Sequence, residues 1–154
     1  MMPLAIPGGK RDSKLDLETG PAIVAHIPSD PADARPVQEE IERALKAHRY
    51  AEPEIFAIRL AVEEALVNAI KHGNALNPSK KVRIAYHVRA EHFEIVVADE
   101  GPGFDPEEVP DPTAPENLER CCGRGLMLMR HYMSEVAYNR RGNSVRMRKL
   151  RKKS

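Results

Sequence analysis

The sequence predicts an α+β fold, a two-layer α/β sandwich in which a mixed, mostly antiparallel sheet is covered on one face by helices. The first reason is the order of the elements: two helical stretches are followed by a strand pair, a long loop, a third helix and a second strand pair. The second reason is that short turns join the paired strands, because short turns connect antiparallel neighbours. A doubly wound parallel sheet is therefore not expected.

Length and composition limit the classes of function. The chain has 154 residues and a mass of 17.2 kDa, which suits one domain with a single core. Its net charge of +1 gives no field that favours nucleic acid or a membrane surface. No apolar run reaches the length of a membrane span, and residues 1–14 lack the apolar core of a secretory signal. We therefore expect a cytoplasmic protein that binds neither nucleic acid nor membrane directly.

Shifts in composition divide the chain into three parts. Residues 1–20 are rich in glycine, proline and charge and are expected to form a flexible arm, residues 21–150 form the folded domain, and residues 151–154 form a basic tail. The tail is expected to be solvated, with contact to an acidic partner surface as the alternative. Cys121 and Cys122 are adjacent and no second cysteine pair exists, so we expect free thiols in a reducing compartment.

Three stretches in the first half of the chain have the pattern of regular structure. Residues 22–29 alternate weakly between apolar and polar side chains and are bounded by prolines. This pattern indicates a strand at an edge of the sheet. A proline-interrupted turn follows, and residues 37–48 carry apolar side chains at helical spacing. A central helix with Pro53 in its first turn extends to Gly73, which suits a left-handed residue at a helix end. The apolar stripe of this helix consists of Ile55, Ile58, Val62, Ala65, Leu66 and Ala69.

The central helix carries a carboxylate and an amide on one face. Glu64 and Asn68 are four residues apart, so they lie one turn apart beside the apolar stripe. A carboxylate can orient and deprotonate a hydroxyl group, and an amide oxygen can bind a hard cation. Taken alone, the pair has a simpler interpretation as solvated residues of an amphipathic helix.

The second half of the chain predicts two strand pairs separated by a loop and a helix. Residues 81–90 and 92–99 alternate with period two and are joined by a tight connection, which predicts a hairpin. The proline- and glycine-rich loop that follows has a length typical of a functional lid or a disordered segment. Residues 126–133 predict a short helix, and residues 134–150 predict two strands around a turn at residues 141–143. Three methionines of the short helix are expected in the core: Met127, Met129 and Met133.

An aspartate and two glycines follow the predicted hairpin. Asp99 stands at the end of a strand, directly before Gly101 and Gly103. An ionised aspartate only accepts hydrogen bonds, which suits an exocyclic amino group such as that of adenine. The glycines permit a positive φ and let the backbone approach a flat ligand closely. An ordinary strand-ending turn is the alternative, because Gly, Pro and Asp favour turns.

A second glycine-rich stretch, Gly123-Arg124-Gly125, precedes the helix that begins near Leu126. Free backbone N–H groups and the positive end of the helix dipole make such a helix start a site for anions, and Arg124 adds a positive charge. The stretch is not a Walker A motif, because no Gly-Lys-Ser/Thr follows, and it opens no βαβ unit of the Rossmann type. A flexible entry to the helix is the alternative.

Together the three stretches resemble the N box and the two glycine boxes of the GHKL (Bergerat) ATP-binding fold, the histidine-kinase-like ATPase fold. Within that group the chain is similar to the small, free-standing serine-kinase anti-sigma factors of the bacterial RsbW and SpoIIAB type. The similarity extends from about Ile23 to Leu150. It is specific, because all three boxes occur in the right order and each lies on its expected element.

The resemblance implies ATP and Mg²⁺ as cofactors and assigns a role to each candidate residue. Glu64 would be the catalytic general base, and Asn68 would coordinate Mg²⁺ between the nucleotide phosphates. Asp99 would bind the adenine amino group. The other nucleotide-binding residues would be Gly101, Gly103, Gly123, Arg124, Gly125 and Leu126.

The resemblance also implies an activity and partners. The expected activity is transfer of the ATP γ-phosphate to a serine or threonine of a small anti-anti-sigma (STAS) protein, together with sequestration of a sigma factor, and a homodimer is implied. The alternatives are a nucleotide-responsive protein-binding module without kinase activity and an α+β domain that binds no nucleotide. One departure from the family is Gly142-Asn143-Ser144 in place of Gly-Thr, so the usual hydroxyl contact would come from Asn143 or Ser144, or be absent.

Overall fold

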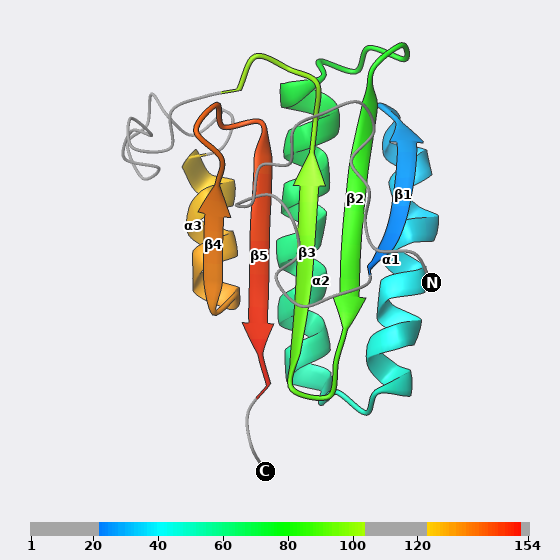
Figure 1. The fold of residues 1–154 in the computed structure, drawn as a ribbon, viewed down its shortest axis with the longest axis vertical. Coiled ribbons are helices and arrows are strands. Elements are labelled where there is room, and N and C mark those ends of the chain that lie inside the picture. The colour runs from blue at the N-terminus through cyan, green and yellow to red at the C-terminus, as the bar shows by residue number, and fades with distance from the viewer. Residues whose placement is uncertain (1–21, 104–122, 152–154) are drawn as a thin grey trace.

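The computed structural model describes residues 22–103 and 123–151. In these residues a five-stranded sheet, in the order β1-β2-β3-β5-β4, is covered on one face by three helices (Figure 1). The helices are α1 (Pro31–Ala47), α2 (Glu52–Val67) and α3 (Gly123–Tyr132), and a π-helical segment, η1 (Asn68–Gly73), continues α2. The strands are β1 (Ile23–Pro28), β2 (Lys81–Val88), β3 (His92–Ala98), β4 (Glu135–Tyr138) and β5 (Ser144–Leu150). The predicted two-layer α+β sandwich is confirmed.

The sheet is antiparallel in all four strand pairings of the described residues. β1 lies at one edge, as predicted, and β4 lies at the other. Both predicted strand pairs are present: β2 with β3, and β4 with β5. Because side chains alternate along each strand, one face of the sheet meets the helices and the other is turned away from them.

The core lies between the sheet and the helices. On β2 and β3, alternate residues are buried against the helices: Val82, Ile84, Tyr86, Phe93, Ile95 and Val97. The predicted stripe on the central helix is confirmed, because all six of its apolar residues are buried. The Tyr86 hydroxyl also donates to Glu40 Oε1 at 2.7 Å, which ties β2 to α1.

The first helix begins six residues earlier than the predicted start at Val37. Asp30 accepts a hydrogen bond from the Ala32 N–H at 3.0 Å, and Pro31 occupies the first helical position, where its missing N–H has no consequence. Pro36 lies inside the helix, where it removes one backbone hydrogen bond, but it lies on the exposed side. Interpreting this proline as part of a turn was therefore wrong.

The end of the central helix also differs from the prediction. Beyond α2 the winding widens to η1, where the Asn74 N–H donates to the Ala69 carbonyl, five residues back, at 2.9 Å. After η1 the residues with a positive φ are Ala75 (51°) and Leu76 (59°), whereas the φ of Gly73 is not positive. The prediction of a left-handed Gly73 is therefore wrong, and the need for glycine there has another cause, described below.

The helix after the long loop begins at Gly123, earlier than predicted. Met129 and Met133 are buried, as predicted, whereas Met127 is 51% exposed. Two residues correspond to about 200° around an α-helix, so Met127 lies on nearly the opposite side from Met129. The prediction that Met127 faces the core is therefore wrong.

Arg151, the first residue of the predicted basic tail, is part of the fold. Its guanidinium lies over the Tyr50 ring, 4.4 Å from the centroid. The same group donates to the backbone carbonyls of His48, Arg49 and Ala90. At this residue the prediction of a solvated tail is wrong, because the side chain connects the end of β5 to the α1–α2 connection.

Several predictions concern residues outside the described ranges. These are the N-terminal arm, most of the long loop with Cys121 and Cys122, and residues 152–154. Among the residues that are described, no helix has the length and apolar character needed to cross a membrane.

Candidate functional site

A cleft lies between the C-terminal part of the central helix and the ends of β3, β4 and β5. It is open to solvent on one side. Its lining combines apolar side chains with an amide and a carboxylate, and consists of Ala65, Asn68, Ala69, His72, Gly73, Val97, Asp99, Pro102, Gly103, Tyr138, Gly142, Asn143, Ser144 and Val145.

Asn68 lines one end of this cleft, and Glu64 stands one helical turn before it, outside the lining. The Asn68 N–H donates to the Glu64 carbonyl, so the α-helical spacing predicted for the pair is kept up to the start of η1. Both side chains are half-buried. Within the described residues, Asn68 Nδ2 is buried and makes no hydrogen bond of ordinary geometry, although the Tyr138 hydroxyl lies close to the Asn68 side chain. A buried amide without a partner is destabilising, which makes this side chain a position that a ligand can satisfy.

The first turn of α3 lies against these two side chains. A Cβ added at Gly125 would lie 2.9 Å from Glu64 Oε2 and 3.0 Å from Asn68 Nδ2. These separations are shorter than an ordinary van der Waals contact, so no larger residue fits without displacing a neighbour. The N-terminal end of α3, with its free N–H groups and positive dipole end, therefore lies beside Glu64 and Asn68.

Asp99 stands at the other end of the cleft. Burial raises the pKa of Asp99 from 3.8 to about 6, although the Gly101 N–H and the charge of Lys80 both lower it. The Gly101 N–H donates to Asp99 Oδ1 at 2.7 Å, and the Asp99 N–H donates to the Asn143 carbonyl at 2.8 Å. At neutral pH the group is therefore an ionised, oriented acceptor, able to bind a ligand amino group.

Three glycines bring backbone segments together around Asp99. A Cβ at Gly73 would overlap the Asp99 carboxylate, and a Cβ at Gly101 would overlap the Gly73 carbonyl. Gly103 has a φ of +82°, and its Cβ would overlap the Arg141 carbonyl. The predicted positive φ is thus confirmed for Gly103, whereas Gly73 and Gly101 are needed because η1 and the segment after β3 approach so closely.

The turn between β4 and β5 forms the remaining wall. Asn139 Oδ1 accepts from the Asn143 N–H at 3.0 Å, and Asn139 Nδ2 donates to Asn143 Oδ1 at 2.7 Å. Asn143 Nδ2 also donates to the Gly101 carbonyl at 3.3 Å. The Ser144 hydroxyl is buried and makes no hydrogen bond within the described residues. The Asn143 side chain therefore closes the wall, and a ligand contact by the Ser144 hydroxyl stays a prediction.

Asn74 is a supporting residue to which the sequence analysis assigned no role. Its side chain is fully buried, and Nδ2 donates to Ser29 Oγ at 2.9 Å and to the Lys81 carbonyl at 3.0 Å. Its Oδ1 accepts from the Glu100 N–H at 2.7 Å. One amide thus connects the ends of η1, β1 and β3 with the start of β2, next to Asp99. A polar residue directly after Gly73 was the only signal in the sequence.

Residues from all three predicted stretches come together here. Asn68, Asp99 and Gly103 line the cleft, and Gly101, Glu64 and Gly125 lie next to these residues. Gly123 and Arg124 form the first turn of α3, but the surroundings of their side chains lie outside the described residues. The Leu126 side chain is buried in the core, so only its backbone is available for a phosphate contact.

The family model of the histidine kinase-like ATPase domain matches residues 27–149. The chain belongs to this family. Its α+β architecture agrees with a solved structure of the RsbU and RsbW domains of Rv1364c from Mycobacterium tuberculosis, with a TM-score of 0.59. That likeness covers 86% of this chain and 32% of the other at 18% identity, so it supports the fold alone.

Curated relatives of this ATPase-domain protein are named as kinases and anti-sigma factors. The serine-protein kinase RsbW of Oceanobacillus iheyensis is 34% identical over 53% of this chain, and the match spans only 56% of that relative. RsbW of Bacillus subtilis is 28% identical, with 82% of this chain and 84% of the relative covered. The anti-sigma F factor of Oceanobacillus iheyensis is 35% identical, with 66% and 73% covered.

Proposed function

We propose that this domain is an ATP-dependent protein serine/threonine kinase of the anti-sigma-factor type, with Glu64 as its general base. The observation that carries the proposal is the position of Gly125 against Glu64 and Asn68. It puts the first turn of α3 beside a carboxylate and an amide, where helix-start N–H groups would bind an anion and the amide oxygen would bind a cation. Nucleotide binding alone does not need a carboxylate at that end of the cleft, whereas phosphoryl transfer to a hydroxyl does.

The residues present fit ATP and Mg²⁺. Asp99 is an acceptor-only group suited to an adenine amino group, and Asn68 supplies an amide oxygen suited to a hard cation. Asn68 Nδ2 is buried with no hydrogen bond of ordinary geometry in the described chain, so a ligand acceptor would complete it. Gly125 leaves room for the α3 backbone to approach phosphate oxygens.

In the proposed reaction each residue has one task. Asn68 Oδ1 would hold Mg²⁺, which neutralises charge on the phosphates when bound. Glu64 would accept the proton of the attacking serine or threonine hydroxyl. The hydroxyl oxygen would bond to the γ-phosphorus while the bond between the γ-phosphorus and the β,γ-bridging oxygen breaks, which leaves ADP. The first-turn N–H groups of α3, with Arg124, would donate to phosphate oxygens. Asp99 would hold the adenine ring at the far end.

The proposed partners follow from the names of the similar proteins. Relatives with the names RsbW and anti-sigma F factor suggest a STAS-type antagonist as the phosphate acceptor and a sigma factor as the sequestered protein. A cytoplasmic location and a homodimer belong to the same proposal. Residues 21–150 would form the kinase domain, with 1–20 as an arm and 151–154 as a tail.

A phosphate-transfer assay with matched variants tests the proposal. The chain is mixed with ATP carrying a labelled γ-phosphate, Mg²⁺ and a purified STAS protein from the source organism. Glu64→Gln should bind Mg²⁺-ATP like the wild type but transfer phosphate about 10²–10⁴-fold more slowly. Glu63→Gln is the control, because Glu63 is the exposed neighbour on the same helix. Equal transfer by Glu64→Gln and wild type would refute the assignment of the base.

A second comparison separates the kinase from a binding module. Asn68→Ala should weaken ATP binding only when Mg²⁺ is present, because the lost ligand acts through the cation. If the wild type binds ATP and changes its affinity for a partner but transfers no phosphate, the protein is a nucleotide-responsive module without kinase activity. Unchanged Mg²⁺ dependence in Asn68→Ala would remove its metal role.

A further inference from the structure

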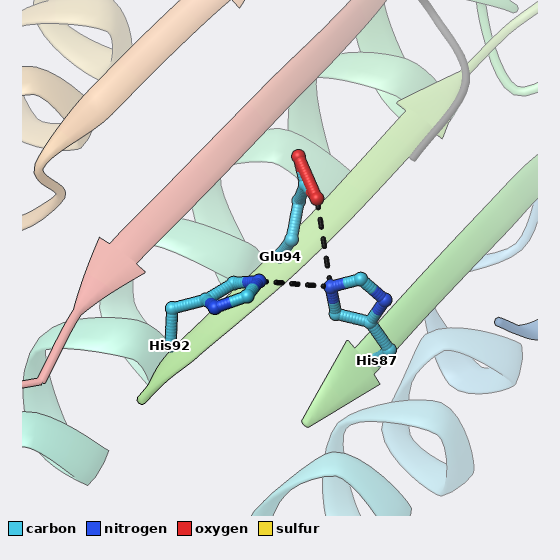
Figure 2. A group of neighbouring side chains, drawn as sticks. All are labelled: His87, His92 and Glu94. Atoms are coloured by element: carbon cyan, nitrogen blue, oxygen red, sulfur yellow. Dashed lines mark hydrogen bonds and ion pairs between the residues drawn. The ribbon is translucent and has the colours of Figure 1, made fainter. Parts of the chain in front are cut away.

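A cluster of two histidines and a glutamate lies on the sheet face that is turned away from the helices (Figure 2). His87 comes from β2, and His92 and Glu94 come from β3. His87 pairs directly with Glu94 across the two strands, and His92 precedes Glu94 by two residues. Residues at this spacing project from the same face, so the hairpin brings three side chains with metal-binding atoms together.

The distances in this cluster are those of ligands around one small cation. His87 Nε2 lies 3.2 Å from His92 Nε2 and 3.5 Å from Glu94 Oε1. All three donor atoms lie within 4.8 Å of one another. For Zn²⁺ bound at about 2.0–2.1 Å in a tetrahedron, neighbouring ligand atoms are about 3.3–3.4 Å apart. The two measured contacts to His87 therefore need little adjustment.

The two oxygens of Glu94 have different surroundings. Oε2 lies 3.4 Å from Arg146 Nη1 and 3.3 Å from Arg148 Nη2. Oε1, which faces His87, accepts no hydrogen bond within the described residues although the Glu94 side chain is fully buried. Guanidinium groups on one oxygen thus orient the other toward the imidazoles, as outer partners of metal-bound carboxylates do.

The charges of the cluster select the kind of cation. The positive charges of Arg146 and Arg148 repel a cation. These charges are offset by the carboxylate of Glu94 and by that of Glu135, which lies 3.9 Å from Arg148. Mg²⁺ and Ca²⁺ prefer several oxygen ligands and gain little from one shared carboxylate. A first-row transition metal gains from two imidazole nitrogens, which favours the Zn²⁺ class.

We propose that His87, His92 and Glu94 form a site for a divalent transition metal of the Zn²⁺ class. Three protein ligands leave a fourth position for water or for a side chain of a partner. The site lies on the opposite face of the sheet from the cleft, so it does not depend on the proposed kinase function.

Cobalt absorption and zinc competition test the site in the full chain. Cys121→Ser and Cys122→Ser form the background of every variant, because thiolates also bind these metals. Co²⁺ is added first, since four-coordinate Co²⁺ gives strong visible absorption and six-coordinate Co²⁺ gives weak absorption. Zn²⁺ is then titrated against the Co²⁺ signal to measure affinity.

His92→Gln is the decisive variant, because His92 is half-buried and its replacement leaves the Glu94–arginine pairs in place. His26→Gln is the control, a histidine on β1 that is exposed and outside the cluster. A melting curve in chelator confirms that each variant is folded, and Mg²⁺-ATP titration checks that the cleft is unchanged.

The expected result is one equivalent of Co²⁺ with strong absorption, displaced by Zn²⁺. In His92→Gln the Zn²⁺ affinity should fall by at least about 10–100-fold, the loss known even for outer-shell changes. His26→Gln should match the background chain. Weak absorption, no metal binding by the background chain, or equal affinity in His92→Gln would each overturn the proposal.

Discussion

Replacing Asp99 with asparagine should separate stability from ligand binding. The substitution keeps the shape of the side chain and an oxygen that can accept the Gly101 N–H bond, but it removes the charge. Burial raises the folded-state pKa of Asp99 from 3.8 to about 6, so the ionised carboxylate is less stable in the folded chain than in the unfolded one. Asp99→Asn should therefore stabilise the ligand-free domain near neutral pH.

The magnitude follows from the pKa. A rise from 3.8 to about 6 at 1.36 kcal/mol per pH unit sets a ceiling of about 3 kcal/mol. Because the carboxylate is only half-buried at the wall of an open cleft, solvent screening lowers the expected gain to about 1–2 kcal/mol. For a chain of this size that corresponds to an increase in Tm of about 2–8 °C.

The sign of the pH dependence makes the prediction specific. The folded carboxyl group keeps its proton up to about pH 6, whereas the unfolded one loses it near 3.8, so the free energy of unfolding falls between these values as pH rises. The advantage of Asp99→Asn should be complete above about pH 6 and absent below about pH 4.

Urea unfolding of both chains across this pH range measures the difference. Glu91→Gln, which changes an exposed carboxylate in the β2–β3 turn, is the control. In the same preparations, calorimetric titration of wild type with Mg²⁺-ATP should show binding that Asp99→Asn loses. A variant that is less stable than wild type at neutral pH, or a gain that persists at low pH, would refute the reasoning.

Two further substitutions test the contact between α3 and Glu64 and the role of Arg151 after β5. Gly125→Ala should leave the free energy of unfolding unchanged or raise it by up to about 1 kcal/mol, since alanine favours helix. It should nevertheless slow phosphate transfer at least about 10-fold, because the added Cβ would lie 2.9 Å from Glu64 Oε2. Wild-type transfer rates would contradict the packing of α3 on Glu64. Arg151→Ala should lower the free energy of unfolding by about 1–3 kcal/mol through loss of the Tyr50 contact and the carbonyl bonds. Urea unfolding with exposed Arg140→Ala as the control measures this loss, and equal effects would contradict it.

Local patterns predicted most of the fold because they reflect local physics. The stripe on the central helix and the alternation in β2 and β3 arise from burial of one face, which needs no knowledge of the partner segment. The errors occurred where local residues permit two structures. The sequence favours a turn around Pro36 before the first helix, but a helix with a capped start tolerates this proline on its exposed side.

The contacts that distant segments make could not be predicted in the same way. Asn74 makes hydrogen bonds to Ser29 after β1, to Lys81 of β2 and to Glu100 after β3, and Arg151 reaches the α1–α2 connection. Nothing near these residues in the sequence specifies those partners. The pairing of His87 with Glu94 likewise depends on strand register, and shifting the register by one residue would put one of them on the other face of the sheet.

Candidate residues of the site could be named from the sequence, whereas their arrangement could not. Glu64, Asn68 and Asp99 were proposed from the chemistry of their functional groups and from the resemblance of their stretches to a known ATP-binding fold, and neither argument depends on where they meet. Their meeting depends on Gly73 and Gly125, where a Cβ would collide with Asp99 or with Glu64. Neither glycine has the positive φ that usually explains a required glycine. Replacing Glu64 or Asp99 should thus remove the proposed proton acceptor or the proposed adenine contact, whereas replacing either glycine should displace an intact acid from its position.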